Sequence, residues 1–273
     1  HALIVMDNRR WLVHLSRPSF STHLGNLDLA QVVGKSDGWT TTFAGRQVSF
    51  FLPGLPDILM KTKRQTQIMY PKDIATILLL ADVRPEDRII ETGTGSGALL
   101  TALVDRVKKG TILTIEQRPE FQHLARENLT RWFGTVPATV RMVLGNACDP
   151  ELKIGVARGW ADKLILDLPE PWEALHLTSY LRGGGTLVVF NPQIAQIQQV
   201  AVCLQGRGFG TMTVFETLVR EWLVDEKRTR PADLMRGHTG FILIARRTVA
   251  ERHGRRAPAT RCPAEGHEDK EEP

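Results

Sequence analysis

The segment Glu91-Thr92-Gly93-Thr94-Gly95-Ser96-Gly97 decides the fold of this 273-residue chain. Its first residue ends 88–91, which has the length of a short strand. The segment precedes 98–109, where apolar residues recur at helical spacing. A glycine turn between a strand and a helix exposes backbone amides at the helix N-terminus, where part of a ligand can bind. The segment therefore predicts a ligand-binding turn.

The spacing of the glycines indicates the kind of ligand. Gly97 lies four residues after Gly93, whereas the dinucleotide fingerprint G-x-G-x-x-G needs five. An acid that ends a strand and is followed by x-G-x-G-x-G is instead the form of loop that holds S-adenosyl-L-methionine. This ligand has no pyrophosphate, so the glycines admit its methionine and ribose parts. The spacing thus disfavours an NAD oxidoreductase.

Strands and helices alternate along the chain around this segment, which predicts a parallel sheet covered on both faces. Two final strands with no helix between them predict an antiparallel edge. This order resembles the layout of the class I methyltransferase sheet, so we expect an α/β fold with a seven-stranded, Rossmann-like sheet. We expect strands at 88–91, 111–116, 140–144, 163–168, 185–190, 211–224 and 241–245. We expect helices at 71–80, 98–109, 119–133 and 194–204.

The first 64 residues have a different pattern, with short strand-like runs between turn residues. A strand is expected at 11–15, and a hairpin at 39–51 around Ala44-Gly45, after which prolines break the pattern. Residues 1–64 contain eight Lys or Arg and four Asp, a balance of +4. We predict a small β-rich N-terminal domain at 1–64, an adenosylmethionine-dependent methyltransferase domain at 65–249 and a disordered tail at 250–273.

Composition excludes several classes of protein. The hydrophobic fraction of 42% and the charged fraction of 24% exclude wholesale disorder. No apolar run reaches the roughly 18–20 residues of a membrane span. Three distant cysteines without a CxxC pair disfavour a disulfide scaffold and a metal site, and they predict a reducing, cytoplasmic location. The net charge of +5 permits a polyanionic partner without requiring one.

Two acids lie at strand ends, where open α/β sheets bind their ligands. Glu116 ends the strand after the glycine turn and can accept both ribose hydroxyls of a nucleoside; a solvated strand-end Glu is the alternative. Asp167 opens the turn Asp167-Leu168-Pro169-Glu170-Pro171-Trp172, which is similar to the base-clamping turns of amino-group methyltransferases. In isolation, a capping Asp explains that turn equally well.

Two further motifs flank the sheet. Tyr70, in Tyr70-Pro71-Lys72-Asp73, can stack on a flipped base, although one Tyr before a helix is more often a packing residue. His238 can contact a substrate, or its loop can serve mainly to lead the chain into the last strand through Gly237 and Gly240.

Together these motifs resemble the tRNA (adenine-N1)-methyltransferases of the TrmI and Trm61 type, which act at position 58 in the T-loop. The resemblance covers nearly the whole chain, up to Phe241. It rests on the Tyr70–Asp73 and Glu91–Gly97 segments, Asp167-x-Pro-x-Pro-Trp172, Arg220-x-Trp222, and the block from Arg230-Pro231 to His238-Thr239. It implies an enzyme that uses S-adenosyl-L-methionine, binds tRNA and forms a homotetramer.

The resemblance also implies roles for individual residues, with Asp167 and Tyr70 as the catalytic pair. The implied cofactor-binding residues are Gln67, Glu91, Gly93, Gly95, Ser96, Gly97, Ala98, Leu99, Glu116, Phe121, Asn146 and Asp167. The implied substrate-binding residues are Lys61, Lys63, Arg64, Tyr70, Arg220, Arg230 and His238. Asn146 departs from the family, in which many members have Asp facing the donor's adenine; its amide oxygen can still accept from the adenine N6 amine.

The implied reaction is attack of adenine N1 on the donor methyl, with Asp167 holding the N6 amine and the basic N-terminal domain holding phosphates. Two alternatives remain. One is another class I methyltransferase acting on a protein or a small molecule, against which the basic β-rich domain argues. The other is a non-catalytic tRNA-binding subunit, against which the intact glycine turn and Asp167 argue.

Overall fold

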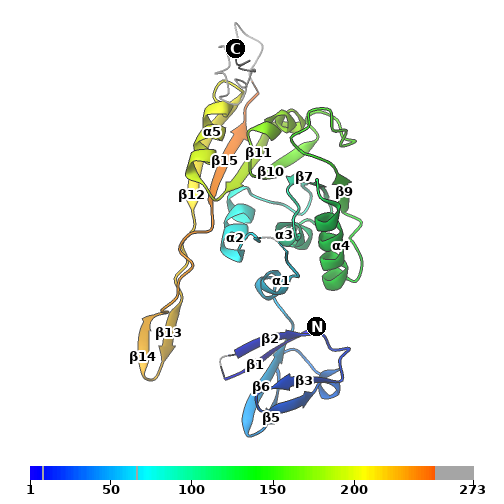
Figure 1. The fold of residues 1–273 in the computed structure, drawn as a ribbon, viewed down its shortest axis with the longest axis vertical. Helices are drawn as coiled ribbons and strands as arrows, with labels where there is room; N and C mark the ends of the chain where they lie inside the picture. The colour runs from blue at the N-terminus through cyan, green and yellow to red at the C-terminus, as the bar shows by residue number, and fades with distance from the viewer. Residues whose placement is uncertain (8, 66, 250–273) are drawn as a thin grey trace, which may run out of the picture. The chain divides into compact units, whose positions relative to one another are not determined.

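The computed structural model describes residues 1–7, 9–65 and 67–249, so the tail predicted at 250–273 lies outside the described residues. The chain divides into two compact units (Figure 1). The first unit is His1–Thr62 and the second begins at Lys63, two residues before the methyltransferase domain was expected to begin. Each unit has its own sheet.

The N-terminal unit is built on a four-stranded antiparallel sheet in the order β2-β1-β6-β5. Its other elements are a small hairpin, a short 3-10 turn and one helix. The bounds are β1 Ala2–Met6, β2 Arg9–Val13, β3 Ser19–Thr22, β4 Gly25–Asp28, η1 Ala30–Val32, β5 Trp39–Phe43, β6 Arg46–Phe51 and α1 Leu55–Lys61. Buried apolar side chains from these elements form a separate core, in which Ile4 is 1% and Val48 0% exposed.

The expected hairpin at 39–51 is confirmed, and its turn has the two positive φ angles that such tight turns need, 47° at Ala44 and 73° at Gly45. The strand expected at 11–15 is instead β2, two residues earlier. Helix α1 was not expected, because Pro56 was interpreted as a break. Pro56 in fact lies in the first turn of the helix, where backbone N–H groups have no partner within the helix, so a residue without an N–H fits there.

The second unit contains the predicted seven-stranded sheet, in the order β12-β15-β11-β10-β7-β8-β9. Strand β15 pairs antiparallel with both β11 and β12, and the other neighbours are parallel, so the expected antiparallel edge is confirmed. The bounds are β7 Arg88–Thr92, β8 Thr111–Glu116, β9 Val140–Leu144, β10 Ala161–Asp167, β11 Leu181–Asn191, β12 Phe209–Glu216 and β15 Phe241–Arg247.

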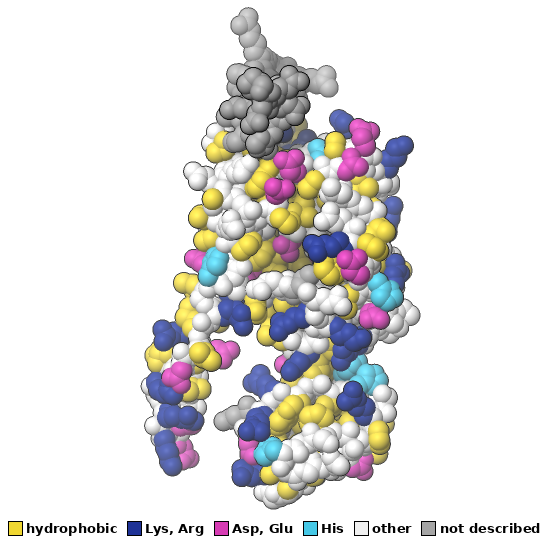
Figure 2. Space-filling view, viewed as in Figure 1, with side chains coloured by type: hydrophobic (Ala, Val, Ile, Leu, Met, Phe, Trp, Pro, Cys, Tyr) yellow, Lys and Arg dark blue, Asp and Glu magenta, His cyan; other side chains and the backbone are white. Residues whose placement is uncertain are grey.

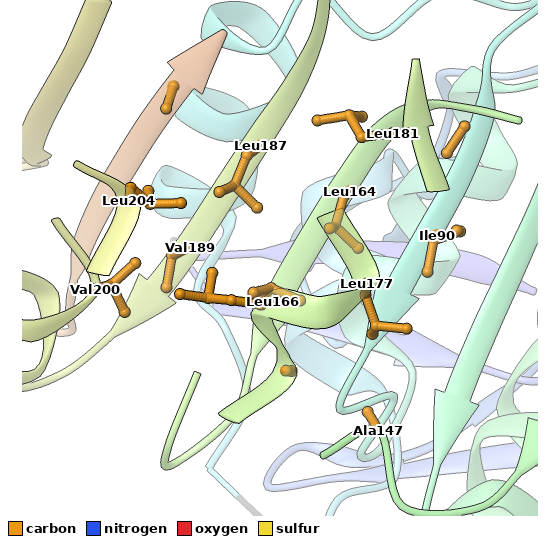
Figure 3. Packing of buried hydrophobic residues seen from close by; sticks show 14 of the residues in the cluster. Ile90, Ala147, Leu164, Leu166, Leu177, Leu181, Leu187, Val189, Val200 and Leu204 are labelled. Carbon is orange, nitrogen blue, oxygen red and sulfur yellow. The ribbon is translucent and has the colours of Figure 1, made fainter. Parts of the chain in front are cut away.

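Helices cover the sheet, and the buried strands are apolar on both faces. In Figure 3, Val200 and Leu204 of α5 (Ile194–Leu204) lie with Leu187 and Val189 of β11 in one cluster, which η2 (Glu173–Tyr180) completes. The alternate strand residues, such as Ile89, are equally buried. The remaining helices, α2 Pro71–Leu80, α3 Ala98–Arg106 and α4 Pro119–Phe133, contact the sheet through β15, β8 and β9.

Helix α3 ends three residues earlier than expected. The backbone N–H groups of Lys109 and Gly110 both donate to the carbonyl of Pro85, at 2.8 and 2.9 Å. This contact pulls 107–110 out of the helix and into the turn that leads to β8. The periodic pattern of the sequence could not show it, because Pro85 belongs to an earlier loop.

The single strand expected at 211–224 is wrong. Strand β12 ends at Glu216, and a separate hairpin of β13 (Trp222–Asp225) and β14 (Arg228–Pro231) follows. The reason is that β15 begins at Phe241, opposite Glu216, so later residues have no partner in the sheet and pair with each other. In Figure 1 this hairpin projects away from the ends of β12 and β15.

Helix α2 holds the base of that hairpin through a buried polar cluster. The Lys72 ammonium donates to Asp73 Oδ1 at 2.8 Å, to the Thr217 carbonyl at 2.7 Å and to the Thr239 hydroxyl. The Thr239 hydroxyl donates in turn to Asp73 Oδ2 at 2.6 Å. Asp73 is fully buried. Through these hydrogen bonds the cluster fastens both ends of the 217–239 segment to helix α2.

The buried position of Asp73 makes Lys72 important for stability. Lys72→Met leaves that carboxylate without its cation, so we expect the free energy of unfolding to fall by about 3–5 kcal/mol, measured by urea denaturation. Lys108→Met is the matched control, because its ion pair with Asp105 is exposed and should contribute under about 1 kcal/mol. Equal losses in the two variants would contradict the expectation.

Candidate active site

A cavity of about 440 Å³ lies at the carboxyl ends of β7, β8, β9 and β10. A smaller cavity of about 50 Å³ lies against the glycine turn, and the two cavities share Gln67, Gly93, Gly95 and Asp167. In a parallel sheet this is the edge at which ligands bind. Most of the predicted cofactor-binding residues line one of the two cavities. The larger also contacts Glu116, Phe121 and Asn146, and the smaller Ser96, Ala98 and Leu99.

The glycine turn lies directly against the end of β10. A Cβ atom on Gly93 would lie 1.9 Å from the carbonyl oxygen of Asp167, so any residue other than glycine would clash with that oxygen. Gly93, Gly95 and Gly97 have φ angles of 75°, 53° and 79°, in the left-handed region that disfavours other residues. Gly97 lines neither cavity; it is the residue that caps the N-terminus of α3, and it packs against Ala125 of α4. The turn is therefore shaped by close backbone contact.

The carboxylate of Glu116 is fixed by two backbone donors. Gly95 N–H donates to its Oε2 at 2.8 Å and Arg118 N–H to its Oε1 at 3.0 Å. The side chain is only 6% exposed, so Glu116 is not the solvated strand end that the sequence left open. Each carboxylate oxygen keeps a further lone pair. Glu116 can therefore accept hydrogen bonds from two hydroxyl groups of a ligand in the cavity.

Two more acids lie close to Glu116 and titrate abnormally. Burial raises the pKa of Glu91 to about 8; a hydrogen bond with Thr114 opposes the rise, and the charges of Asp167 and Glu116 add to it. Burial raises the pKa of Asp167 to about 7, and the charge of Glu116 adds to the rise. A cation bound between these groups would favour their ionised forms. The cavity therefore suits a ligand that carries positive charge.

The far wall of the cavity comes from the segments after β8 and β9. Arg118 places its guanidinium 4.6 Å from the centre of the Phe121 ring, in a cation–π contact. Asn146 is exposed, and its Oδ1 accepts from the Cys148 N–H at 3.0 Å. Sequence reasoning missed Arg118 and Cys148 as lining residues. The position of Arg118, two residues after the strand-ending Glu116, was a signal that could have found it.

Tyr70 lies beside the site without lining either cavity. It is half-buried and directly precedes α2, whereas the preceding Gln67, Ile68 and Met69 line the smaller cavity. The guanidinium of Arg236 lies 4.2 Å from the centre of the Tyr70 ring. Tyr70 is thus at the edge of the site and stacked with a cation from beyond the hairpin.

The structure does not gather the other predicted substrate-binding residues at the cavity. Arg220 is exposed, and Arg230 forms an ion pair with Asp233 on the hairpin. Lys63 pairs with Glu127 of α4 at 3.4 Å, and Arg64 beside it is exposed. Lys61 is exposed in the N-terminal unit.

Each ring nitrogen of His238 lies within hydrogen-bond distance of an acceptor oxygen. Its Nδ1 lies 2.7 Å from a Glu216 carboxylate oxygen and its Nε2 2.8 Å from the Pro192 carbonyl. The Glu216 hydrogen bond raises the pKa of His238, and the Pro192 carbonyl adds to the rise. A protonated imidazole donates from both nitrogens, so this residue is occupied in joining three segments of chain.

Two kinds of functional feature are absent from the described residues. No helix within 1–7, 9–65 and 67–249 is both long and apolar enough to cross a membrane. Over the same residues, no group of three or more His, Cys, Asp or Glu side chains is arranged to hold a metal ion.

Comparison with solved structures places the fold. The chain is 34% identical to a SAM-dependent O-methyltransferase from Thermotoga maritima, with a TM-score of 0.82 over 92% of this chain and 94% of that one. It is 28% identical to the tRNA (m1A58) methyltransferase TrmI from Aquifex aeolicus, with a TM-score of 0.80 over 91% and 97%. The seven-stranded sheet is therefore the class I methyltransferase fold, as expected.

Comparison of sequences identifies the family. The chain is 30% identical to the Methanocaldococcus jannaschii tRNA (adenine(57)-N(1)/adenine(58)-N(1))-methyltransferase TrmI, over 89% of this chain and 94% of the relative. It is 32% identical to the Thermus thermophilus tRNA (adenine(58)-N(1))-methyltransferase TrmI, over 90% and 97%. The family model described as tRNA methyltransferase complex GCD14 subunit matches residues 53–239, and the chain belongs to that family.

Proposed function

We propose that this protein transfers the methyl group of S-adenosyl-L-methionine to N1 of adenine 58 in the T-loop of tRNA. The observation that carries the proposal is the cavity where the glycine turn, Glu116 and Asp167 meet. Membership of a tRNA methyltransferase family supports the class of substrate. The relatives from M. jannaschii and T. thermophilus, both named for adenine 58 N1, support the atom and the position.

The residues around the cavity fit this donor. Glu116, fixed by Gly95 and Arg118, would accept the ribose hydroxyls, and Phe121 and Asn146 would flank the adenine. Asp167, which lines both cavities, suits the positive end of the ligand, because its burial without a cation raises its pKa. Glu91 lines neither cavity and would act from behind the glycine turn, where burial also raises its pKa. When bound, the donor supplies a methyl group activated by a sulfonium.

The chain itself then contributes position and charge. Adenine N1 is neutral at pH 7 and needs no strong base, so orientation and electrostatics supply the catalysis. Asp167 accepts from the N6 amine and offsets the positive charge that develops on the ring. Because N1 lies on the Watson–Crick edge, the base must leave its stack, and Tyr70 at the edge of the site would hold it.

Basic residues outside the cavity would hold the tRNA phosphates. The exposed candidates are Lys61, Lys63, Arg64, Arg220 and Arg230. Figure 2 shows Lys and Arg side chains gathered on the projecting hairpin. His238, in contrast, would act by fastening the base of that hairpin, since both ring nitrogens are already bonded.

The proposal extends to a cytoplasmic homotetramer. Exposed apolar side chains on the hairpin and just after it support self-association, since Trp222 is 57%, Val224 73% and Leu234 92% exposed. A relative from Dictyostelium discoideum is named a catalytic subunit, which also supports assembly of some kind.

One alternative has specific support, because the T. maritima structure is named for O-methyl transfer. Mass spectrometry of nucleosides separates the two functions. Unmodified tRNA transcript treated with enzyme and donor should yield 1-methyladenosine, and a transcript with guanosine at position 58 should not. Without product on the first transcript, the proposed function fails.

Replacement of Asp167 tests its role in this assay. Asp167→Ala should lower the turnover number by about 100-fold or more, as loss of one preorganised charge-stabilising group does. Asp167→Asn should retain part of the activity, because an amide oxygen still accepts from N6. Asp105→Ala, an exposed substitution on α3, is the control and should be near wild type. Wild-type turnover of Asp167→Ala would remove this residue from the mechanism.

The raised pKa of Asp167 predicts a pH dependence. Only the ionised carboxylate both accepts from N6 and opposes the developing charge, so kcat/KM should rise with pH and reach half its maximum near pH 7. Asp167→Asn should lack this step. The measurement is initial methyl transfer from pH 5.5 to 8 with both tRNA and donor limiting, so that the rate reports the pKa of the protein without its cationic ligand. A rate that falls over this range would contradict the assignment.

Glu116 should control donor affinity. Glu116→Ala should weaken adenosylmethionine binding by about 1.5–3 kcal/mol, the range for hydrogen bonds to a charged group, as measured by isothermal titration. Affinity for tRNA should change little. Glu120→Ala, an acid in the first turn of α4, serves as the control. Donor affinity equal to wild type would mean that the Glu116 carboxylate only supports the glycine turn.

A further inference from the structure

The turn after Asp167 is held by side chains from the next strand and helix. Asn191, the last residue of β11 and only 1% exposed, donates from Nδ2 to the carbonyl of Leu168 at 3.1 Å and to that of Pro169 at 3.4 Å. Gln196 of α5 donates from Nε2 to the Pro169 carbonyl at 2.8 Å. Both carbonyls that follow Asp167 are therefore hydrogen-bonded to side-chain amides.

The backbone ladder stops just before this turn. Strands β10 and β11 pair up to Asp167 and Phe190, one residue short of Asn191. Pro169 has no N–H, so it cannot donate a ladder bond that would extend the pairing. The side chain of Asn191 continues the connection between the two strands beyond the point where their backbones do.

The orientation of the Asn191 amide is fixed by what surrounds it. The Gln193 N–H donates to Asn191 Oδ1 at 3.0 Å, which leaves the Nδ2 donors for the two carbonyls. The next residue, Pro192, is held through its carbonyl by His238, and His238 is held by Glu216. The amide is thus anchored from the base of the hairpin.

This arrangement decides which acceptor the turn offers to a substrate. Leu168 and Pro169 line the cavity together with Asp167, yet their carbonyls already accept from Asn191 and Gln196. The carboxylate of Asp167 is left as the acceptor for an amine. We propose that Asn191, assisted by Gln196, is a positioning residue that orients Asp167 and keeps the turn's carbonyls away from the adenine N6 amine.

The inference rests on the proposed function, and its test compares variants in the tRNA assay. Asn191→Asp keeps the shape but replaces the donor by an acceptor facing two carbonyls, so kcat should fall by about 10–100-fold, as small misplacements of catalytic groups do. The donor's dissociation constant and the KM for tRNA should stay within twofold, since Asn191 lines neither cavity. A variant with wild-type kcat overturns the inference.

A second substitution keeps the test decisive if Asn191→Asp fails to fold. Gln196→Glu directs a carboxylate at the Pro169 carbonyl from a half-buried helix position, and kcat should fall about tenfold. Gln198→Glu adds the same charge on the exposed side of the same helix and should change kcat by less than twofold. Equal rates for these two variants overturn the inference.

A coupling measurement separates positioning from simple stabilisation. If Asn191 acts through Asp167, adding Asn191→Asp to Asp167→Ala should lower kcat by less than a further twofold. If the fold-losses in kcat of the two single variants instead multiply in the double variant, Asn191 acts independently of Asp167 and the inference is overturned.

A final measurement needs no substrate, so it holds even if tRNA is not methylated. The carbon-13 carboxyl resonance of Asp167, assigned with Asp167→Asn, should shift or broaden in Asn191→Asp and in Gln196→Glu, and should be unchanged in Gln198→Glu. An unchanged Asp167 resonance in all three overturns the inference. Absence of 1-methyladenosine from the wild-type protein would instead refute the proposed function alone.

Discussion

The contact between the backbone of Gly93 and the carbonyl of Asp167 is the constraint on which the site depends. Strands β7 and β10 are neighbours in the sheet, and no side chain separates the turn after one from the end of the other. This closeness brings the glycine turn, which would hold the donor, next to the acid that would hold the acceptor. A methyl group has to cross only a short distance, so the geometry of the sheet itself supplies the proximity that catalysis needs.

The same closeness has an electrostatic consequence. Glu91 ends up buried near Asp167 and Glu116, and three carboxyl groups share one region of low polarity. In the free protein this is unfavourable, and the pKa values of two of the acids rise accordingly. A cationic ligand removes part of the penalty, whereas the neutral thioether left after methyl transfer does not. Under the proposed function, these acids would therefore favour the cationic donor over the product in the same cavity.

Much of this site could be predicted from the sequence, because its signals are local. Helices α2 and α4 begin and end where proline and apolar spacing placed them, and the glycine spacing with Glu116 indicated the cavity that the structure contains. Asp167 could be placed at the cavity because it ends a strand.

What the sequence did not reveal depends on partners distant in the chain. The hairpin after Glu216 follows from where β15 begins, and α3 ends early because of Pro85. Asn191 could not be singled out either, since a buried amide has no pattern of its own and its importance comes from the Leu168 and Pro169 carbonyls. Local periodicity in the sequence identifies helices and strands. Strand register and contacts between residues distant in the chain can be seen only in the folded structure.

The cluster around Lys72 has a consequence for how this protein can evolve. The chain leaves the sheet at Thr217 and returns at Thr239, and Lys72 bonds to both residues. Between these residues the hairpin of β13 and β14 pairs with itself. Its length and character can therefore change without altering the pairing of β12 and β15, provided that the contacts of Arg236 and His238 near its base remain. The fold carries an exchangeable arm, on which new surfaces can arise while the chemistry at the centre of the sheet is conserved.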